Sequence, residues 1–139
     1  MRAAKVMTSP VITVAEHTPV SEAAAILTGH GFTSVPVVDG AGQMTGIVSE
    51  SDLMRDRVRP EGWPAQPEHA DPAVGTVMIK VPLALRPDSD LADVVSLMLA
   101  EPVRAVPIVE DGRLVGIITR RDVLRALERG GTGLGDPTT

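Results

Sequence analysis

The stretch Gly46-Ile47-Val48-Ser49-Glu50-Ser51-Asp52 returns 70 residues further along the chain (46 to 116) as Gly116-Ile117-Ile118-Thr119-Arg120-Arg121-Asp122. Both copies share a glycine, two aliphatic residues, a hydroxyl residue and an aspartate three positions after the hydroxyl. An apolar run followed by Ser/Thr-x-x-Asp predicts a strand that leads directly into a helix. Two such copies predict two structural repeats.

Two more matches extend the repeat toward the N-terminal side of each copy. Val35-Pro36-Val37-Val38-Asp39 returns as Val106-Pro107-Ile108-Val109-Glu110, and Val6-Met7 returns as Val77-Met78, both at a shift of 71 residues (36 to 107 and 7 to 78). Three matches in the same order, with one residue lost in a turn, indicate that the two halves share one fold. We expect the halves to stack around a pseudo-two-fold axis.

Each half has the predicted element order β-α-β-β-α. The helices are expected to start at Thr18-Pro19 and at Ser89-Asp90, because Ser and Thr are good N-caps and Pro is tolerated at the first helical position. Turn residues at 39–42 and 110–112 predict a hairpin in each half. The predicted strands are 11–14, 35–38 and 44–48 in the first half and 82–85, 106–109 and 113–118 in the second, and the second helices start at about Glu50 and about Arg120.

These elements divide the chain into a first repeat at 1–58, a linker at 59–73, a second repeat at 74–129 and a disordered tail at 130–139. The linker is rich in Pro, Gly and charge and contains Trp63. A lone Trp in a loop is expected to cover one edge of the repeats. The tail has too little apolar surface to order itself.

The composition excludes several functional classes. With one Phe, one Trp and no Tyr, the core must consist of Val, Ile, Leu, Met and Ala. The net charge of -5 and the lack of an aromatic row argue against nucleic-acid binding. The chain has no Cys, and its three His residues are far apart, so we expect no disulfide and no metal site.

The sequence contains no membrane-spanning or targeting segment that we can identify. No apolar run is long enough to cross a bilayer. The N-terminus lacks the apolar stretch of a signal peptide. We therefore expect a cytoplasmic protein that does not contact a membrane.

Taken together, these motifs resemble the CBS (cystathionine β-synthase) domain family. The features are the opening Val6-Met7-Thr8, the Gly31-Phe32-Thr33-Ser34-Val35-Pro36 turn into a strand, and the two Ser/Thr-x-x-Asp copies, and the resemblance covers about Lys5 to Glu128. It implies an α/β (α+β) fold of two β-α-β-β-α repeats, with small three-stranded sheets packed by helices and two clefts. Such modules typically dimerise, and many bind AMP, ATP or another adenosyl ligand and regulate a partner.

The Ser/Thr-x-x-Asp motifs have two interpretations. In the first they are helix caps, in which the hydroxyl accepts from a free N–H and the acid favours the helix N-terminus. In the second they contact a nucleotide, because a helix N-terminus suits a phosphate and a carboxylate can accept from both hydroxyls of a ribose. The whole repeat favours nucleotide contact at one or both motifs.

The resemblance assigns site residues position by position. Ser49 and Thr119 would contact phosphate or ribose, and Asp52 and Asp122 would hold the ribose. The adenine would lie against Ile12, Thr13, Phe32, Val35 and Pro36 in the first repeat, and against Leu83, Val103, Val106 and Pro107 in the second. The alternative for the apolar residues in this set is ordinary core packing.

The two expected sites differ in charge and in their base pockets. Glu50 places an anion near the phosphate of the first site. Arg104, Arg120 and Arg121 favour an anion at the second site, although Arg120 and Arg121 can also be read as a solvated helix face. The second site has Ala84 in place of Thr13 and Pro102 in place of Gly31, which weakens its expected base pocket.

We therefore predict a stand-alone, non-enzymatic regulatory module for energy sensing, with an adenosine nucleotide (AMP or ATP) as ligand and no cofactor. It would act as a homodimer or through a protein partner, and the pairing faces would come from the helices at 21–27, 52–58, 93–99 and 122–127. The alternative is a ligand-free structural dimer of the same fold. The sequence has no nucleophile with a base, no Walker-type loop and no metal cluster to support an enzyme.

Overall fold

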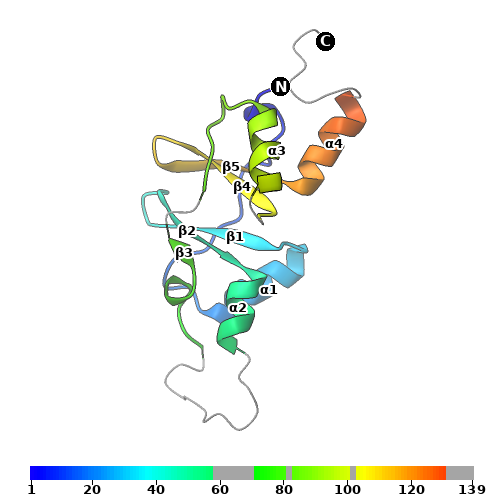
Figure 1. Cartoon of the computed structure of the whole chain (residues 1–139). Coiled ribbons are helices and arrows are strands. Elements are labelled where there is room, and N and C mark those ends of the chain that lie inside the picture. The colour runs from blue at the N-terminus through cyan, green and yellow to red at the C-terminus, as the bar shows by residue number, and fades with distance from the viewer. Residues whose placement is uncertain (58–70, 81–82, 101–102, 131–139) are drawn as a thin grey trace. The chain divides into compact units, whose positions relative to one another are not determined.

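The computed structural model describes residues 1–57, 71–80, 83–100 and 103–130 (Figure 1). Its elements are η1 (Ala3–Lys5), α1 (Val20–His30), β1 (Ser34–Val38), β2 (Met44–Ser49), α2 (Glu50–Arg57), η3 (Val74–Thr76), β3 (Ile79–Lys80), α3 (Leu91–Ala100), β4 (Ala105–Glu110), β5 (Arg113–Thr119) and α4 (Arg120–Gly130), where η denotes a 3-10 helix. The predicted helix, hairpin and second helix are confirmed in both halves. Trp63, Pro102 and the tail at 131–139, on which three of the predictions fall, lie outside the described residues.

The chain folds into two compact units. The first unit is Ile12–Pro82, and the second unit joins Met1–Val11 to Leu83–Thr139. The opening segment with Val6 and Met7 therefore packs in the same unit as the second hairpin, and the segment with Val77 and Met78 packs in the same unit as the first. Each unit thus contains a Val-Met segment that comes from the other repeat of the sequence.

In the first unit, a small sheet packs against α1 and α2. β1 and β2 form an antiparallel hairpin that runs from the pair Ser34 and Ser49 to the pair Val38 and Met44. β3 adds to β2 through the antiparallel pairs of Gly46 with Lys80 and of Ile47 with Ile79, which makes three strands. The core is aliphatic, as predicted, and consists of Val14, Val20, Ala23, Leu27, Val35, Val37, Val48, Leu53 and Val74.

The second unit repeats this plan with one difference. β4 and β5 pair from Ala105 and Thr119 to Glu110 and Arg113, and the register shifts between Ile108 and Val109, as it does between Val37 and Val38. Thr8 bridges Ile117 at the position where β3 pairs with β2, so the third strand is reduced to one residue. The core is Ala3, Val6, Leu91, Val94, Met98, Val106, Ile108, Ile118, Val123 and Ala126.

The strand predicted at 11–14 is reduced to the single parallel bridge of Val14 with Val37. In the run predicted at 82–85, the described residues 83–85 form the single parallel bridge of Leu85 with Ile108. The Val14 N–H donates to the Pro36 carbonyl, and the Val38 N–H donates to the carbonyl of Val14. To continue this pairing toward residue 12, residue 36 would have to donate an N–H. Proline has none, so the pairing stops there, and Pro107 has the same effect in the second unit.

The predicted cap of α1 by Thr18 is wrong. The Thr18 hydroxyl accepts from the Ala15 N–H at 3.0 Å, which closes the turn before the helix, and Pro19 occupies the N-cap without a side-chain bond. Ser89 accepts from the Arg86 N–H in the same way, at 3.0 Å. The Ser and Thr hydroxyls therefore stabilise the turn before each helix, and other residues accept hydrogen bonds from the first free N–H groups of the helix.

Those other residues are aspartates. In α3, Asp90 Oδ1 accepts from the Ala92 N–H at 3.0 Å. Pro19 stands at the corresponding place in α1 and cannot accept through its side chain. Asp71, 50 residues away in the sequence, caps α1 instead. Its Oδ1 accepts from the Ser21 N–H at 2.9 Å and its Oδ2 from the Ser21 hydroxyl at 2.6 Å. The C-terminal end of the predicted linker is thereby attached to the start of α1.

Gly46 and Gly116 are required by the close approach of the repeated methionines. A Cβ on Gly46 would lie 2.6 Å from the Met78 sulfur and 2.8 Å from the Ile79 carbonyl oxygen. A Cβ on Gly116 would overlap the side chain of Met7. The two matching features of the sequence, Val-Met and Gly-aliphatic-aliphatic, are therefore packing partners within each unit.

Candidate nucleotide site

The first Ser/Thr-x-x-Asp motif spans the junction of β2 and α2. Asp52 Oδ2 accepts from the Ser49 N–H at 2.9 Å and from the Ser49 hydroxyl at 2.9 Å, and the Asp52 N–H lies 3.3 Å from the Ser49 hydroxyl oxygen. Only 4% of Asp52 is exposed. The cap interpretation of this motif is confirmed, and the geometry brings a buried carboxylate to the N-terminus of a helix.

The second motif repeats this arrangement between β5 and α4. Asp122 Oδ2 accepts from the Thr119 N–H at 2.9 Å and from the Thr119 hydroxyl at 3.1 Å, and the Asp122 N–H lies 3.3 Å from that hydroxyl oxygen. Asp122 is 7% exposed. The two units therefore present the same pair of groups at the same point of the fold.

The second carboxylate oxygens have different partners. Asp52 Oδ1 forms an ion pair with the exposed guanidinium of Arg55, three residues further along α2. Asp122 Oδ1 lies 3.8 Å from Arg125 and accepts from the Thr8 hydroxyl at 3.3 Å. Both buried charges are thus satisfied within their own units, as a buried carboxylate requires.

The predicted charged residues surround these helix starts. Glu50 is exposed in the first turn of α2, and its N–H donates to the Thr33 carbonyl at 3.0 Å. The Arg120 N–H donates to the Arg104 carbonyl at 3.3 Å, so the same backbone contact brings Arg104 beside α4. The side chains of Arg104, Arg120 and Arg121 are exposed, which leaves them free to meet an anion or water.

The residues predicted to contact adenine fall into two groups. Those that are buried (Val35, Pro36, Val106 and Pro107) lie in the hairpins, and Val35 and Val106 belong to the two cores. Those that remain accessible are Ile12 at 40% and Leu83 at 50% exposure, together with half-buried Thr13, Phe32 and Val103. For Val35 and Val106, packing in the core is therefore the role that the structure describes.

Phe32 has a partner that sequence reasoning missed. The ring of His30 stacks on it, with the ring centroids 4.9 Å apart and the planes inclined by 13°. Gly31 separates the two rings and adopts φ 70°, a left-handed conformation that glycine accepts readily. The helix-ending glycine between two ring-bearing residues is the signal that could have indicated this pair.

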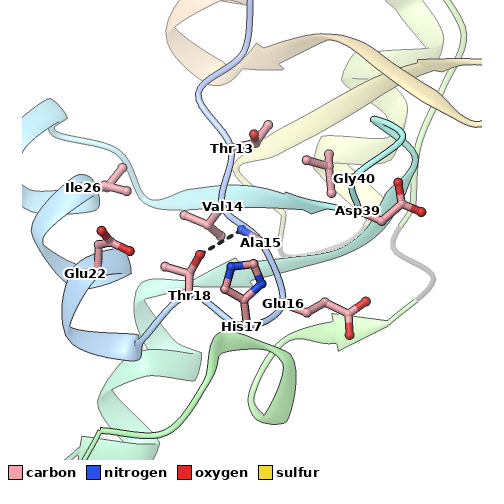
Figure 2. A pocket seen from close by; sticks show the side chains of 11 residues that line it. Thr13, Val14, Ala15, Glu16, His17, Thr18, Glu22, Ile26, Asp39 and Gly40 are labelled. Atoms are coloured by element: carbon pink, nitrogen blue, oxygen red, sulfur yellow. Dashed lines mark hydrogen bonds between the residues drawn. The ribbon is translucent and has the colours of Figure 1, made fainter.

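A hollow of about 580 Å³ lies in the first unit (Figure 2), and Asp52 is not among its lining residues. It is at the opposite end of the hairpin, because Val38 and Asp39 border it, whereas Ser49 pairs with Ser34 at the other end. Of the predicted site residues it includes only Thr13. Its lining residues are Thr13, Val14, Ala15, Glu16, His17, Thr18, Glu22, Ile26, Val38, Asp39 and Gly40.

Among the described residues, no group of three or more His, Cys, Asp or Glu is placed to hold a metal ion. In the same part of the chain, no helix is long and apolar enough to cross a membrane. The clefts predicted between the repeats depend on how the two units are arranged, and they stay a prediction.

The fold and the duplicated motif agree with a family match. The model of the CBS domain matches residues 3–59 and again residues 74–129. The chain therefore belongs to the CBS domain family and carries a tandem pair of its repeats. This confirms the resemblance seen in the sequence.

Two curated relatives are much longer enzymes. The inosine-5'-monophosphate dehydrogenase of Methanocaldococcus jannaschii is 31% identical over 127 residues, which are 89% of this chain and 23% of that protein. The A-adding tRNA nucleotidyltransferase of Aquifex aeolicus is 26% identical over 123 residues, 88% of this chain and 14% of that protein. The chain thus spans less than two thirds of these relatives and corresponds to one part of each.

Solved structures cover the whole pair. The structure of CBSX2 in complex with AMP has a TM-score of 0.82 and 29% identity, and the match covers 94% of this chain and 98% of CBSX2. Another structure of CBSX2, from Arabidopsis thaliana, has a TM-score of 0.78, 29% identity and coverage of 95% and 98%. The fold of a CBS pair is therefore shown for this chain.

Proposed function

We propose that the chain is a regulatory module that binds an adenosine nucleotide, AMP or ATP, in the clefts predicted between its two repeats. The observation that carries this proposal is the pair of buried carboxylates, Asp52 and Asp122, each beside a hydroxyl residue at a helix N-terminus. CBSX2, a structural neighbour, has been solved in complex with AMP, which supports an adenosine ligand. The nucleotide is a ligand, and the module has no reaction to perform.

The chemistry of the motif fits a ribose with a phosphate. Each carboxylate would accept from both hydroxyls of the diol, in charge-assisted hydrogen bonds. The helix behind it would direct free N–H groups and the positive end of its dipole toward the phosphate. Ser49 and Thr119 would add a hydroxyl to the same phosphate or to the ribose.

The base would rest on the accessible residues of the predicted set. Ile12, Thr13 and Phe32 are available in the first unit, and Leu83 and Val103 in the second. Pro36 and Pro107 would stand behind them as rigid backbone. The stacked rings of His30 and Phe32 give the first unit an aromatic surface, so we expect it to be the better base site.

A ligand-free interaction module, a homodimer or the docking surface for another protein, is the second candidate. Large apolar side chains on the outer helices favour it, since Met54 of α2 is 60% exposed, Leu99 of α3 82% and Leu124 of α4 64%. The finding that both carboxylates are already satisfied also favours it. A regulatory nucleotide module can use the same helices to reach its partner, and the cytoplasm remains our expected compartment.

The two candidates are separated by thermal melting with and without AMP or ATP. A ligand present at 100 times its dissociation constant stabilises the protein by ~2.7 kcal/mol, so the nucleotide proposal expects a clear rise in Tm. Asp52→Asn and Asp122→Asn keep the shape and most of the cap, and each should weaken AMP roughly tenfold at its own site in calorimetry, because a bond to a charged group is lost. GMP, which keeps the ribose and the phosphate and changes only the base, serves as the control for recognition of adenine.

A ligand-free module would show the same Tm with every nucleotide. If AMP raises Tm equally in wild type and in a variant with both aspartates replaced, the nucleotide binds elsewhere and the motifs are helix caps only.

A further inference from the structure

Thr8 bonds to the carboxylate of Asp122 although it lies 114 residues before it in the sequence. Its hydroxyl lies 3.3 Å from Oδ1 and 3.4 Å from Oδ2, a hydrogen bond shared between both oxygens. The backbone holds it there, because the Thr8 N–H donates to the Ile117 carbonyl at 2.8 Å and the Ile117 N–H donates back at 3.1 Å. The N-terminal segment therefore reaches the group that would bind the ribose.

The carboxylate cannot keep Thr8 and also accept a ribose diol. An ionised carboxylate offers about four acceptor positions, two on each oxygen. The Thr119 N–H and hydroxyl take those of Oδ2, at 2.9 and 3.1 Å. A diol donates two hydrogen bonds and would then need both positions of Oδ1, but the Thr8 hydroxyl already donates to that oxygen.

Among the described residues of the first unit, the position that corresponds to Thr8 carries no hydroxyl. Ile79 stands at the corresponding place, because it pairs with Ile47 as Thr8 pairs with Ile117. At Asp52, Oδ1 is held instead by Arg55, whose side chain is 73% exposed and can turn into solvent. The two otherwise equal carboxylates thus differ in the group that a ligand has to displace.

We propose that Thr8 is a positioning residue that lowers the affinity of the Asp122 site for an adenosine nucleotide, an inference that rests on the proposed function. Its hydroxyl holds the carboxylate in the free protein and leaves Oδ1 when the ribose binds. Because coupling between two bound groups is reciprocal, a ligand at Asp122 weakens the attachment of residues 1–8 to the second unit. The N-terminal segment is then the element that responds to the nucleotide.

Calorimetric titration with AMP tests the proposal one site at a time. In an Asp52→Asn background, which leaves the Asp122 site, Thr8→Val should tighten AMP by about fivefold to tenfold. Tenfold corresponds to ~1.4 kcal/mol, the low end for a bond to a charged group, as expected for a long and shared bond. Thr8→Ser keeps the hydroxyl and should match the parent.

A hydroxyl introduced at the corresponding position of the first unit provides the reverse test. In an Asp122→Asn background, Ile79→Thr should weaken AMP at the Asp52 site severalfold. Ile79 is 54% exposed, so this change disturbs little packing. It also decides the question if Thr8→Val does not fold.

Tm without ligand separates positioning from a structural role. A structural Thr8 would lower Tm on replacement by Val and leave AMP binding unchanged or weaker, which would overturn the proposal. Unchanged AMP affinity in both Thr8→Val and Ile79→Thr, with binding still lost on replacement of the aspartates, would overturn this inference alone. No AMP binding by the wild-type protein would overturn the proposed function as well.

Discussion

At the scale of single residues, the two motif glycines are needed because they have no Cβ. Gly46 and Gly116 are buried in β2 and β5, and in each case a methionine side chain occupies the space where a Cβ would stand. The Gly46 site is the more constrained, because the carbonyl oxygen of Ile79 also lies 2.8 Å from that position. A methionine can turn away, whereas a carbonyl in a strand can move only with its backbone.

We therefore predict that Gly46→Ala destabilises the protein by ~1–3 kcal/mol, the usual effect of overpacking, and that Gly116→Ala destabilises it less. Denaturation midpoints measured in urea would show the difference. Gly40→Ala is the matched control, because nothing lies within 4 Å of its Cβ position, and it should stay within about 0.5 kcal/mol of wild type. Equal stability of Gly46→Ala and Gly40→Ala would contradict this account of the motif.

Separation in the sequence decides which contacts of the site could be predicted. The short-range pattern Ser49 to Asp52 is a known helix-start pattern, so the cap could be predicted in detail. The bond from Thr8 to Asp122 could not, because it joins residues 114 positions apart. The residues next to Thr8 in the sequence do not indicate which carboxylate its hydroxyl will contact.

At the scale of elements, hairpins and helices were predictable because their signals are local. Apolar spacing identified α1 and α3, and turn residues identified both hairpins. The strands expected at 11–14 and 82–85 were overestimated, because the partner residues Pro36 and Pro107 lack the N–H that longer pairing needs. β3 was not predicted, since two residues that gain their pairing from a distant strand carry no periodicity of their own.

Asp71 tests whether a helix can depend on a residue that is distant in the sequence. Because it caps α1 through the Ser21 N–H and hydroxyl, Asp71→Ala should destabilise the protein by ~1 kcal/mol. Asp71→Asn, which keeps a good acceptor, should lose less. Chemical denaturation with an unchanged m-value would identify the change as one of stability.

Asp90→Ala is the matched comparison, because Asp90 caps α3 from the adjacent position and should cost a similar amount. Asp88→Ala, at an exposed aspartate of the same turn, should change stability by no more than about 0.5 kcal/mol. If Asp71→Ala is as stable as wild type, the bonds from Asp71 to Ser21 are not needed to start α1.

At the scale of the whole molecule, charge is divided unevenly between the two units. Residues 12–82 contain four Lys and Arg and nine Asp and Glu, a net charge of -5, whereas the remaining residues contain nine of each. The formal charge of the chain therefore lies entirely in the segment that forms the first unit. The fold itself is almost duplicated, so the difference between the two proposed sites comes from side chains on a common frame.

This asymmetry leads to a prediction about which nucleotide each site prefers. Glu50 and the surrounding negative charge should penalise the extra phosphates of ATP at the Asp52 site, so that site should prefer AMP. Arg120 and Arg121 are exposed in the first turn of α4 and Arg104 is exposed beside it, so the Asp122 site should accept ADP or ATP better. Calorimetry with AMP and ATP on Asp52→Asn and Asp122→Asn, each of which leaves one site intact, measures the two preferences separately.

Salt provides the control for an electrostatic cause. The Debye length grows from ~8 Å at physiological ionic strength to about 30 Å at 0.01 M, so both preferences should increase as salt is lowered. Glu50→Gln should bring ATP closer to AMP at the Asp52 site, because it removes the repelling charge at the first turn of α2 and keeps the size of the side chain. A ratio of ATP to AMP affinity that is the same at both sites and does not change with salt would show that shape, and not charge, distinguishes them.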